Sequence, residues 1–173
     1  MCIRDSFLTL SVGGEVGYGD TYGDSSNSEF GLPFFEHFYG GGVRSVRGFE
    51  DNTLGPRTTF DLGSVDPDTG EPNVLIGRPY GGDFIVTSSV ELAFPTPFTK
   101  GDTSAARLAL FFDAGQVYED LDAFDADELR YSAGLWLTWQ APVGPIIINL
   151  VKPLNEREGD ETEEIQFAFG NFF

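Results

Sequence analysis

The segment LRYSAGLWLTWQ, residues 129–140, alternates between two kinds of side chain. Tyr131, Leu135 and Trp139 fall on one side of the alternation, whereas Ser132 and Gln140 fall on the other. A period of two is typical of a β-strand with one apolar face, because successive side chains of a strand point to opposite sides. An amphipathic helix would repeat about every 3.6 residues instead. The segment therefore predicts a strand.

The same period of two extends to both sides of this segment and predicts an all-β, antiparallel protein. Aromatic and β-branched residues fill the alternate positions, as they do in strands. No run reaches the ~18 apolar residues of a membrane helix, but a strand of a transmembrane barrel needs only ~9 to 11 residues. Six strands are expected, at residues 7–19, 83–94, 106–118, 129–140, 145–151 and 163–173.

The connections between these strands alternate in length. Those at 20–82, 119–128 and 152–162 are long, whereas those around 95–97 and 141–145 are tighter and rich in proline. Long loops at one end and short turns at the other are typical of an outer-membrane barrel, whose long loops are extracellular. Alternation alone also fits a soluble sheet with one buried face. Aromatic residues near strand ends favour the barrel, because barrels carry aromatic girdles; they are Tyr131, Trp139 and Phe173.

The charge of the chain excludes a nucleic-acid partner. Asp and Glu number 28 against 10 Lys and Arg, so the formal net charge is -18, and phosphate binding needs a basic face. Acidic residues cluster at 119–128 and 156–164, where they predict solvated loops. The sole histidine, His37, has no nucleophile in a recognisable motif, and the aspartates at 120–127 lack the spacing of a calcium loop. No catalytic residue, metal site or cofactor is therefore predicted.

The connection 20–82 is far longer than usual, which marks it as either functional or disordered. Its middle contains Val-Arg-Gly-Phe at 46–49, preceded by three glycines at 40–42. We expect this loop to fold back into the barrel, with Arg47 reaching the strands, because its aromatic residues are too apolar for a solvated tip. These aromatic residues are Phe34, Phe35, Phe38, Tyr39 and Phe49.

Two carboxylates are candidate partners of Arg47. Glu91 and Asp113 fall on the lumen-type faces of the second and third expected strands. A guanidinium presents a planar fork of donors that suits carboxylates. The predicted docking site of the loop therefore comprises Arg47, Gly48, Phe49, Glu91 and Asp113.

Five motifs, in the same order, resemble the outer-membrane insertase superfamily, also called the bacterial surface antigen family. The resemblance covers nearly all of the chain after Ser6 and is greatest for the assembly-factor branch. Translocation and assembly modules share the loop arginine, but usually carry tyrosine after the glycine and lack the Phe-Pro-Thr-Pro-Phe run. The motifs are VRGF at 46–49, ELAFPTPF at 91–98, LFFDAG at 110–115, WQAPVGP at 139–145 and the terminal residues 166–173.

The resemblance implies that residues 7–173 are the last six strands of a sixteen-stranded outer-membrane barrel. Residues 1–6 have neither the apolar core nor the cleavage site of a secretory signal peptide, and we expect them to be a non-native leader. The resemblance also implies that the loop arginine engages Glu91 and Asp113. The last strand would form a weak seam with the first strand of the barrel and would carry a C-terminal recognition signal. The seam and signal residues are Ile165, Phe167, Phe169, Gly170 and Phe173.

The function implied by the resemblance is the insertion of client β-barrels by seam opening and strand templating, without covalent chemistry. Its partners are outer-membrane lipid, unfolded outer-membrane protein clients, and accessory lipoproteins bound by periplasmic repeats that the chain lacks. The alternatives are a two-partner secretion pore, a translocation and assembly module, the barrel anchor of a patatin-like lipase and, least favoured, a passive porin.

Overall fold

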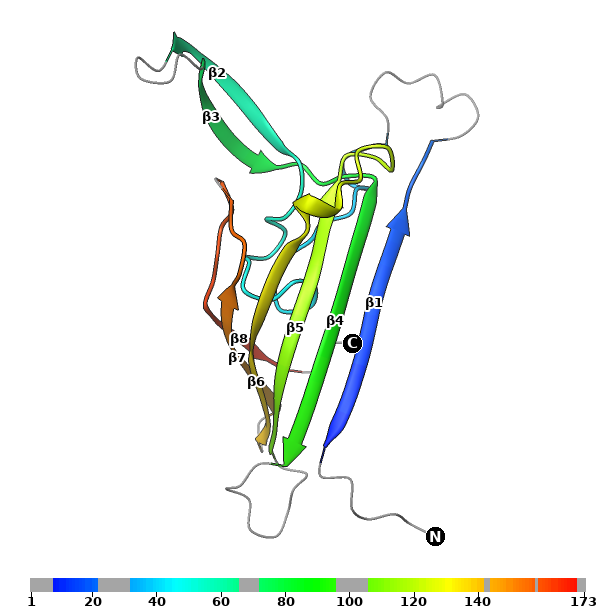
Figure 1. The fold of residues 1–173 in the computed structure, drawn as a ribbon, viewed down its shortest axis with the longest axis vertical. Coiled ribbons are helices and arrows are strands. Elements are labelled where there is room, and N and C mark those ends of the chain that lie inside the picture. Colours follow the sequence, from blue (N-terminus) through cyan, green and yellow to red (C-terminus); the bar gives the residue numbers. More distant parts are fainter. Residues whose placement is uncertain are drawn as a thin grey trace.

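Strands make up nearly all of the regular structure in the computed structural model, which describes residues 8–21, 32–65, 72–95, 106–141, 144–157 and 159–170. One antiparallel sheet of six strands has the order β1-β4-β5-β6-β7-β8, and β2 and β3 form a separate pair (Figure 1). Among the described residues, no helix is long and apolar enough to cross a membrane. The elements are β1 (Thr9–Tyr18), β2 (Arg57–Val65), β3 (Pro72–Pro79), β4 (Phe84–Pro95), β5 (Ala106–Tyr118), the 3-10 turn η2 (Ala126–Glu128), β6 (Arg130–Ala141), β7 (Gly144–Pro153) and β8 (Ile165–Phe169).

The six strands expected from the sequence are confirmed as β1 and β4 to β8. Most boundaries differ by one or two residues. The last strand is shorter than expected: β8 ends at Phe169, because Gly170 adopts a φ of 104° that leaves the extended region. Phe173 lies outside the described residues.

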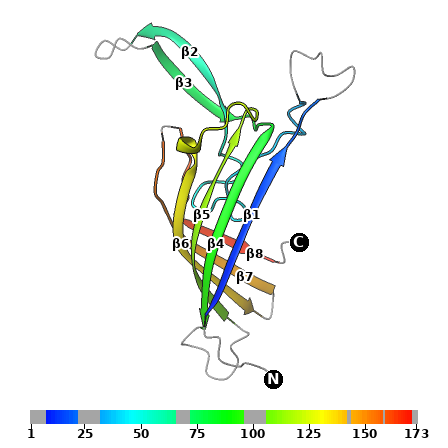
Figure 2. The same cartoon turned by 45° about the vertical axis from the view of Figure 1, so that its right-hand side comes forward.

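The connection 20–82 contains two strands that the sequence analysis missed. β2 and β3 pair with each other and project from one end of the main sheet (Figures 1 and 2). The expectation of a long loop without strands is therefore wrong for this part. The local alternation in RTTFDL, at 57–62, favours a strand, and a local hairpin satisfies the backbone without help from the barrel.

The expected alternation of long and short connections is confirmed at most positions. The connections β1–β4, β5–β6 and β7–β8 share one end of the sheet, and β4–β5 and β6–β7 share the other (Figure 1). Only residues 142 and 143 separate β6 from β7. Between β4 and β5 lie residues 96–105, more than a tight turn requires, and their structure lies outside the described residues.

The convex face of the sheet carries a row of directly paired aliphatic residues across all six strands. Leu110 is 50% exposed and Ile165 is 64% exposed in this chain. Side chains of such size gather on an outer face when that face meets lipid. The register pairs them in the order Leu10, Leu92, Leu110, Leu135, Leu150 and Ile165.

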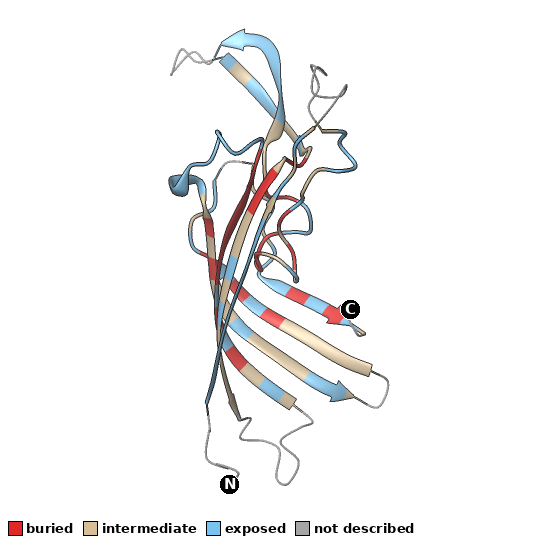
Figure 3. Ribbon diagram, turned by 90° about the vertical axis from the view of Figure 1, so that its right-hand side faces the viewer, coloured by how far each residue is buried: buried red, intermediate tan, exposed pale blue. Residues whose placement is uncertain are grey.

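The concave face carries the buried residues, and residues 32–56 lie against it (Figure 3). Within this segment, Val46, Phe49 and Leu54 form a fully buried cluster. The expectation that all five loop aromatics pack inward is wrong for Tyr39, which is 37% exposed, and for Phe34 and Phe35, which are 72% and 69% exposed. Phe34 and Phe35 occupy a tight turn, closed by a hydrogen bond from the Glu36 amide to the Pro33 carbonyl, where they meet each other edge to face.

Candidate functional site

Arg47 lies at the centre of the segment that docks on the concave face, and its side chain is almost fully buried. Its Nε and Nη2 donate to the two carboxylate oxygens of Asp113 on β5, at 2.6 and 2.8 Å. Its Nη1 lies 2.7 Å from Oε1 of Glu91 on β4. The structure thus brings together the three charged residues that the sequence analysis singled out.

Asp113 is held in place from a second side. It is fully buried, and its cross-strand partner Ser89 donates a hydrogen bond from Oγ to Oδ1 at 2.7 Å. Ser89 also accepts from Arg47 Nη2 at 2.9 Å, so the three residues form a closed ring of hydrogen bonds. The backbone amide of Arg47 donates to Asp113 Oδ2 at 3.2 Å. Both the backbone and the side chain of the loop are therefore fixed by one carboxylate.

The guanidinium of Arg47 is further stabilised by an aromatic ring. Its Cζ lies 3.7 Å from the centroid of Phe111, in the geometry of a cation–π contact. Burial by itself disfavours the cation, but hydrogen bonds and charge from Asp113 and then Glu91 outweigh it and raise the pKa of Arg47. Arg47 is therefore a permanent cation that depends on its two carboxylates.

Gly48 is the residue that lets the segment approach β7. Its φ of 89° lies in the left-handed region, and a Cβ at this position would come within 2.6 Å of Cγ1 of Val151. Any larger residue would meet both a conformational penalty and a clash. The glycine of the Val-Arg-Gly-Phe motif therefore serves packing as well as backbone conformation.

Phe49 anchors the far end of the motif. It is fully buried and forms an isolated antiparallel bridge with Thr162, in the segment that leads into β8. Its carbonyl oxygen accepts a hydrogen bond from Nε2 of Gln166 on β8 at 3.0 Å. The four residues 46–49 thus contact β4 and β5 at one end and the approach to β8 at the other.

The sequence of the chain matches one protein family over nearly its whole length. The model of the Omp85 superfamily domain matches residues 2–173. The chain belongs to the Omp85 superfamily. It is a segment of an outer-membrane β-barrel, and the family resemblance noted in the sequence is confirmed.

Several proteins similar to this Omp85 domain are assembly factors by name. The outer membrane protein assembly factor BamA of Neisseria meningitidis serogroup B is 36% identical over 190 aligned positions, which cover 96% of this chain and 22% of the relative. The 50 kDa subunit of the sorting assembly machinery of Saccharomyces cerevisiae is 26% identical and covers 99% of the chain and 33% of the relative. The chain therefore spans only a fifth to a third of these relatives.

A solved structure agrees with the fold. The crystal structure of BamA from Haemophilus ducreyi lacking POTRA domains 1–3 superposes with a TM-score of 0.74 at 27% identity. The match covers 93% of this chain and 31% of that one. The curved six-stranded sheet is thus part of a barrel of BamA type.

The predicted seam residues of the Omp85 domain lie apart from the arginine. Ile165, Phe167 and Phe169 point outward from β8 and are 64%, 64% and 54% exposed. Gly170 follows the strand and donates its amide hydrogen to the Pro145 carbonyl at 3.0 Å. Phe173 lies outside the described residues. The structure therefore brings Arg47, Gly48, Phe49, Glu91 and Asp113 into one site and leaves the seam residues on the outer face of the edge strand.

Three residues of the site escaped the sequence analysis. Ser89 shares the face of Glu91, and Phe111 shares that of Asp113, so strand parity alone could have indicated both. Gln166 also had the parity of the inner face, but nothing in the sequence connects it to a residue 117 positions away. Long-range contacts of this kind depend on the curvature of the sheet, which a strand pattern does not encode.

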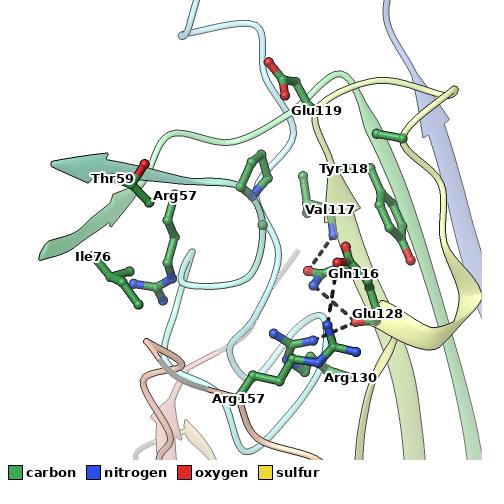
Figure 4. Close-up of a pocket in the computed structure, with 13 residues that line it drawn as sticks. Arg57, Thr59, Ile76, Gln116, Val117, Tyr118, Glu119, Glu128, Arg130 and Arg157 are labelled. Carbon is green, nitrogen blue, oxygen red and sulfur yellow. Dashed lines mark hydrogen bonds and ion pairs between the residues drawn. The ribbon is translucent and has the colours of Figure 1, made fainter. Parts of the chain in front are cut away.

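A second group of arginines lies where the long connections meet the sheet, around a pocket of about 420 Å³ (Figure 4). Arg130 makes a paired contact with the Asp160 carboxylate at 2.5 and 3.1 Å. Arg57 donates to the Thr53 and Gly77 carbonyls, and Arg157 donates to the Asp127 carbonyl. The donors of these arginines are already bonded within the protein, so the arginines connect the loops to one another. The pocket is therefore a poor site for an anionic ligand.

Proposed function

We propose that this chain is the C-terminal barrel segment of an outer-membrane protein assembly factor, which folds client β-barrels into the outer membrane. The observation that carries the proposal is the buried network of Arg47, Asp113, Ser89 and Glu91, which fixes a long loop against the inner face of the barrel. A barrel that only lets solutes pass does not need such a loop. The similarity to BamA and to the sorting assembly machinery subunit supports the same function.

The proposed mechanism uses the edge of the sheet. β8 is the last strand in the sheet order and is only five residues long, and all five pair with β7. In a complete barrel this strand would meet the first strand at a seam. An unpaired strand edge adds further strands readily, so an open seam can template the strands of a client by β-augmentation.

The proposed partners follow from this mechanism. The convex aliphatic row faces outer-membrane lipid, and unfolded outer-membrane proteins are the clients. Accessory lipoproteins would bind periplasmic repeats that lie outside this chain. The proposal involves no covalent step and no cofactor.

The test is the substitution Arg47→Ala in the full-length protein that contains this segment. Removing the guanidinium leaves Asp113 buried without its counter-charge, so we expect the loop to undock while the sheet stays intact. The rate of client insertion into liposomes should fall by about tenfold, within the range typical of coupling between two sites. Arg107→Ala is the matched control, because Arg107 is an exposed arginine on β5.

Two results would contradict the proposal. Normal client insertion together with normal protease resistance of the loop in Arg47→Ala would remove any role for the docked arginine. Export of one secreted protein without insertion of barrels would instead favour the two-partner secretion pore.

A further inference from the structure

The docked loop is bonded to the chain segment that leads directly into the last strand. The Glu163 amide donates to the Gly48 carbonyl at 2.9 Å, and the Glu50 amide donates to the Glu161 carbonyl at 2.9 Å. Together with the bridge between Phe49 and Thr162, these bonds form a short antiparallel ladder. β8 begins at Ile165, so the ladder ends two residues before the strand.

Gln166 extends this connection into the strand itself. It lies between two exposed residues of β8, but its own side chain points inward and is 1% exposed. Its Nε2 donates to the Phe49 carbonyl at 3.0 Å. Its cross-strand neighbour on β7, Asn149, is fully buried and makes no side-chain hydrogen bond to the described residues. The loop therefore supplies, through the Phe49 carbonyl, a hydrogen-bond acceptor for the buried side-chain amide of Gln166 on β8.

Arg47 fixes the same short segment at its other end. It binds Asp113 on β5 and Glu91 on β4, one residue before the glycine that contacts β7. Residues 47–50 thus span the concave face from the middle of the sheet to its edge. A segment held at both ends transmits a change at one end to the other.

We propose that Gln166 and the ladder between 48–50 and 161–163 couple the docked loop to the last strand, so that β8 leaves the first strand of the barrel at the seam only when the loop is released. This inference deepens the proposed function, because it assigns the loop the role of holding the seam strand in place. Gln166 acts as a positioning residue: it contacts the loop rather than the client.

The first test is hydrogen exchange on the full-length protein, read at the amides of residues 165–169. We expect Gln166→Leu, which keeps the volume of the side chain but removes its donor, to speed exchange in β8 by about tenfold. Arg47→Ala should speed exchange in β8 to a similar extent, although it contacts β4 and β5. Gln140→Leu is the control, since Gln140 is an exposed glutamine on β6, and it should leave β8 unchanged.

The second test fixes the ladder covalently. Glu50 and Glu161 are both exposed and directly opposite each other, and opposed residues of an antiparallel pair have Cα atoms about 4.5 to 5.5 Å apart, within the range of a disulfide. We expect Glu50→Cys with Glu161→Cys, in a Cys2→Ser background, to slow client insertion by about tenfold when oxidised and to recover it on reduction.

The results separate this inference from the proposed function. Unchanged exchange of β8 in both Gln166→Leu and Arg47→Ala would overturn the coupling, whether or not the protein inserts clients. Faster exchange in both variants, with client insertion unaffected by the disulfide, would establish contact between loop and strand but overturn the claim that release of the loop precedes opening. Faster exchange together with reversible inhibition supports the whole proposal.

Discussion

The connection between β1 and β4 contains two regions with opposite behaviour. Residues 32–56 lie against the concave face and bury Val46, Phe49 and Leu54 completely. The hairpin of β2 and β3, which follows immediately, leaves Phe60 and Leu62 56% and 60% exposed. Both regions carry large apolar residues, so apolar content alone does not decide which part of the connection docks.

The difference lies in partners on the sheet. In the docked region, Arg47 forms an ion pair with the fully buried Asp113, and Gly48 packs closely against Val151, where a larger residue would not fit. The hairpin satisfies its backbone within its own two strands and contacts the rest of the protein mainly at its base, where Arg57 bonds to the Thr53 carbonyl. Docking of the first region is thus specified by a few polar and steric contacts, and these can be removed one at a time.

The largest expected effect comes from Asp113→Ala. This change removes both side-chain hydrogen bonds from Arg47 to β5 and leaves the buried guanidinium with the Glu91 carboxylate and the Ser89 hydroxyl on β4. Loss of one partner from a buried ion pair typically costs about 3 to 5 kcal/mol, and we expect about 3 kcal/mol because Glu91 remains. The docked region should then behave like the hairpin and become sensitive to limited proteolysis in detergent.

Asp61→Ala provides the control, since Asp61 is an exposed carboxylate on β2. Its loss should leave the proteolysis of residues 32–56 unchanged. If the docked region of Asp113→Ala resists protease as the unsubstituted protein does, then apolar contacts rather than the ion pair hold it, and the distinction between the two regions fails.

Gly48→Ala should have the next largest effect, about 2 kcal/mol, from left-handed strain and overpacking together. The hairpin provides a matched position: Gly63 also has a positive φ, 67°, but a Cβ there would meet no atom within 4 Å. The difference between Gly48→Ala and Gly63→Ala in thermal unfolding measures the contact with Val151 separately from the backbone strain. Equal effects would show that the close approach to β7 contributes nothing.

The sequence predicted the docked region better than the hairpin, for a physical reason. Arg47 is one of 10 basic residues beside 28 acidic ones, and parity placed Glu91 and Asp113 on the inner face, so alternation indicated the partners of Arg47 and the family resemblance implied the same pairing. The main strands followed from the same alternation. The prediction of one long loop overlooked the hairpin, although RTTFDL at 57–62 has a strand pattern of its own.

The contacts with β8 could not be predicted because they depend on the curvature of the sheet. Nothing in the residues around Gln166 indicates that a carbonyl of the docked region would lie 3.0 Å away. The exposure of Phe34 and Phe35 was also unpredictable from composition, since it follows from a local turn at Pro33.

The smallest effect on stability is expected from substitutions in the hairpin. They test whether this region, unlike the docked one, contributes little to the stability of the barrel. Phe60 pairs with Leu75 on an exposed face of β2 and β3, where both side chains are 56% exposed. Replacing both with serine should change the free energy of unfolding of the barrel by less than about 0.5 kcal/mol, because exposed substitutions away from special features have little effect. Thermal unfolding and proteolysis of residues 32–56 should match the unsubstituted protein. A clear loss of stability would mean that this face is covered in the complete barrel, and that both regions are held by burial after all.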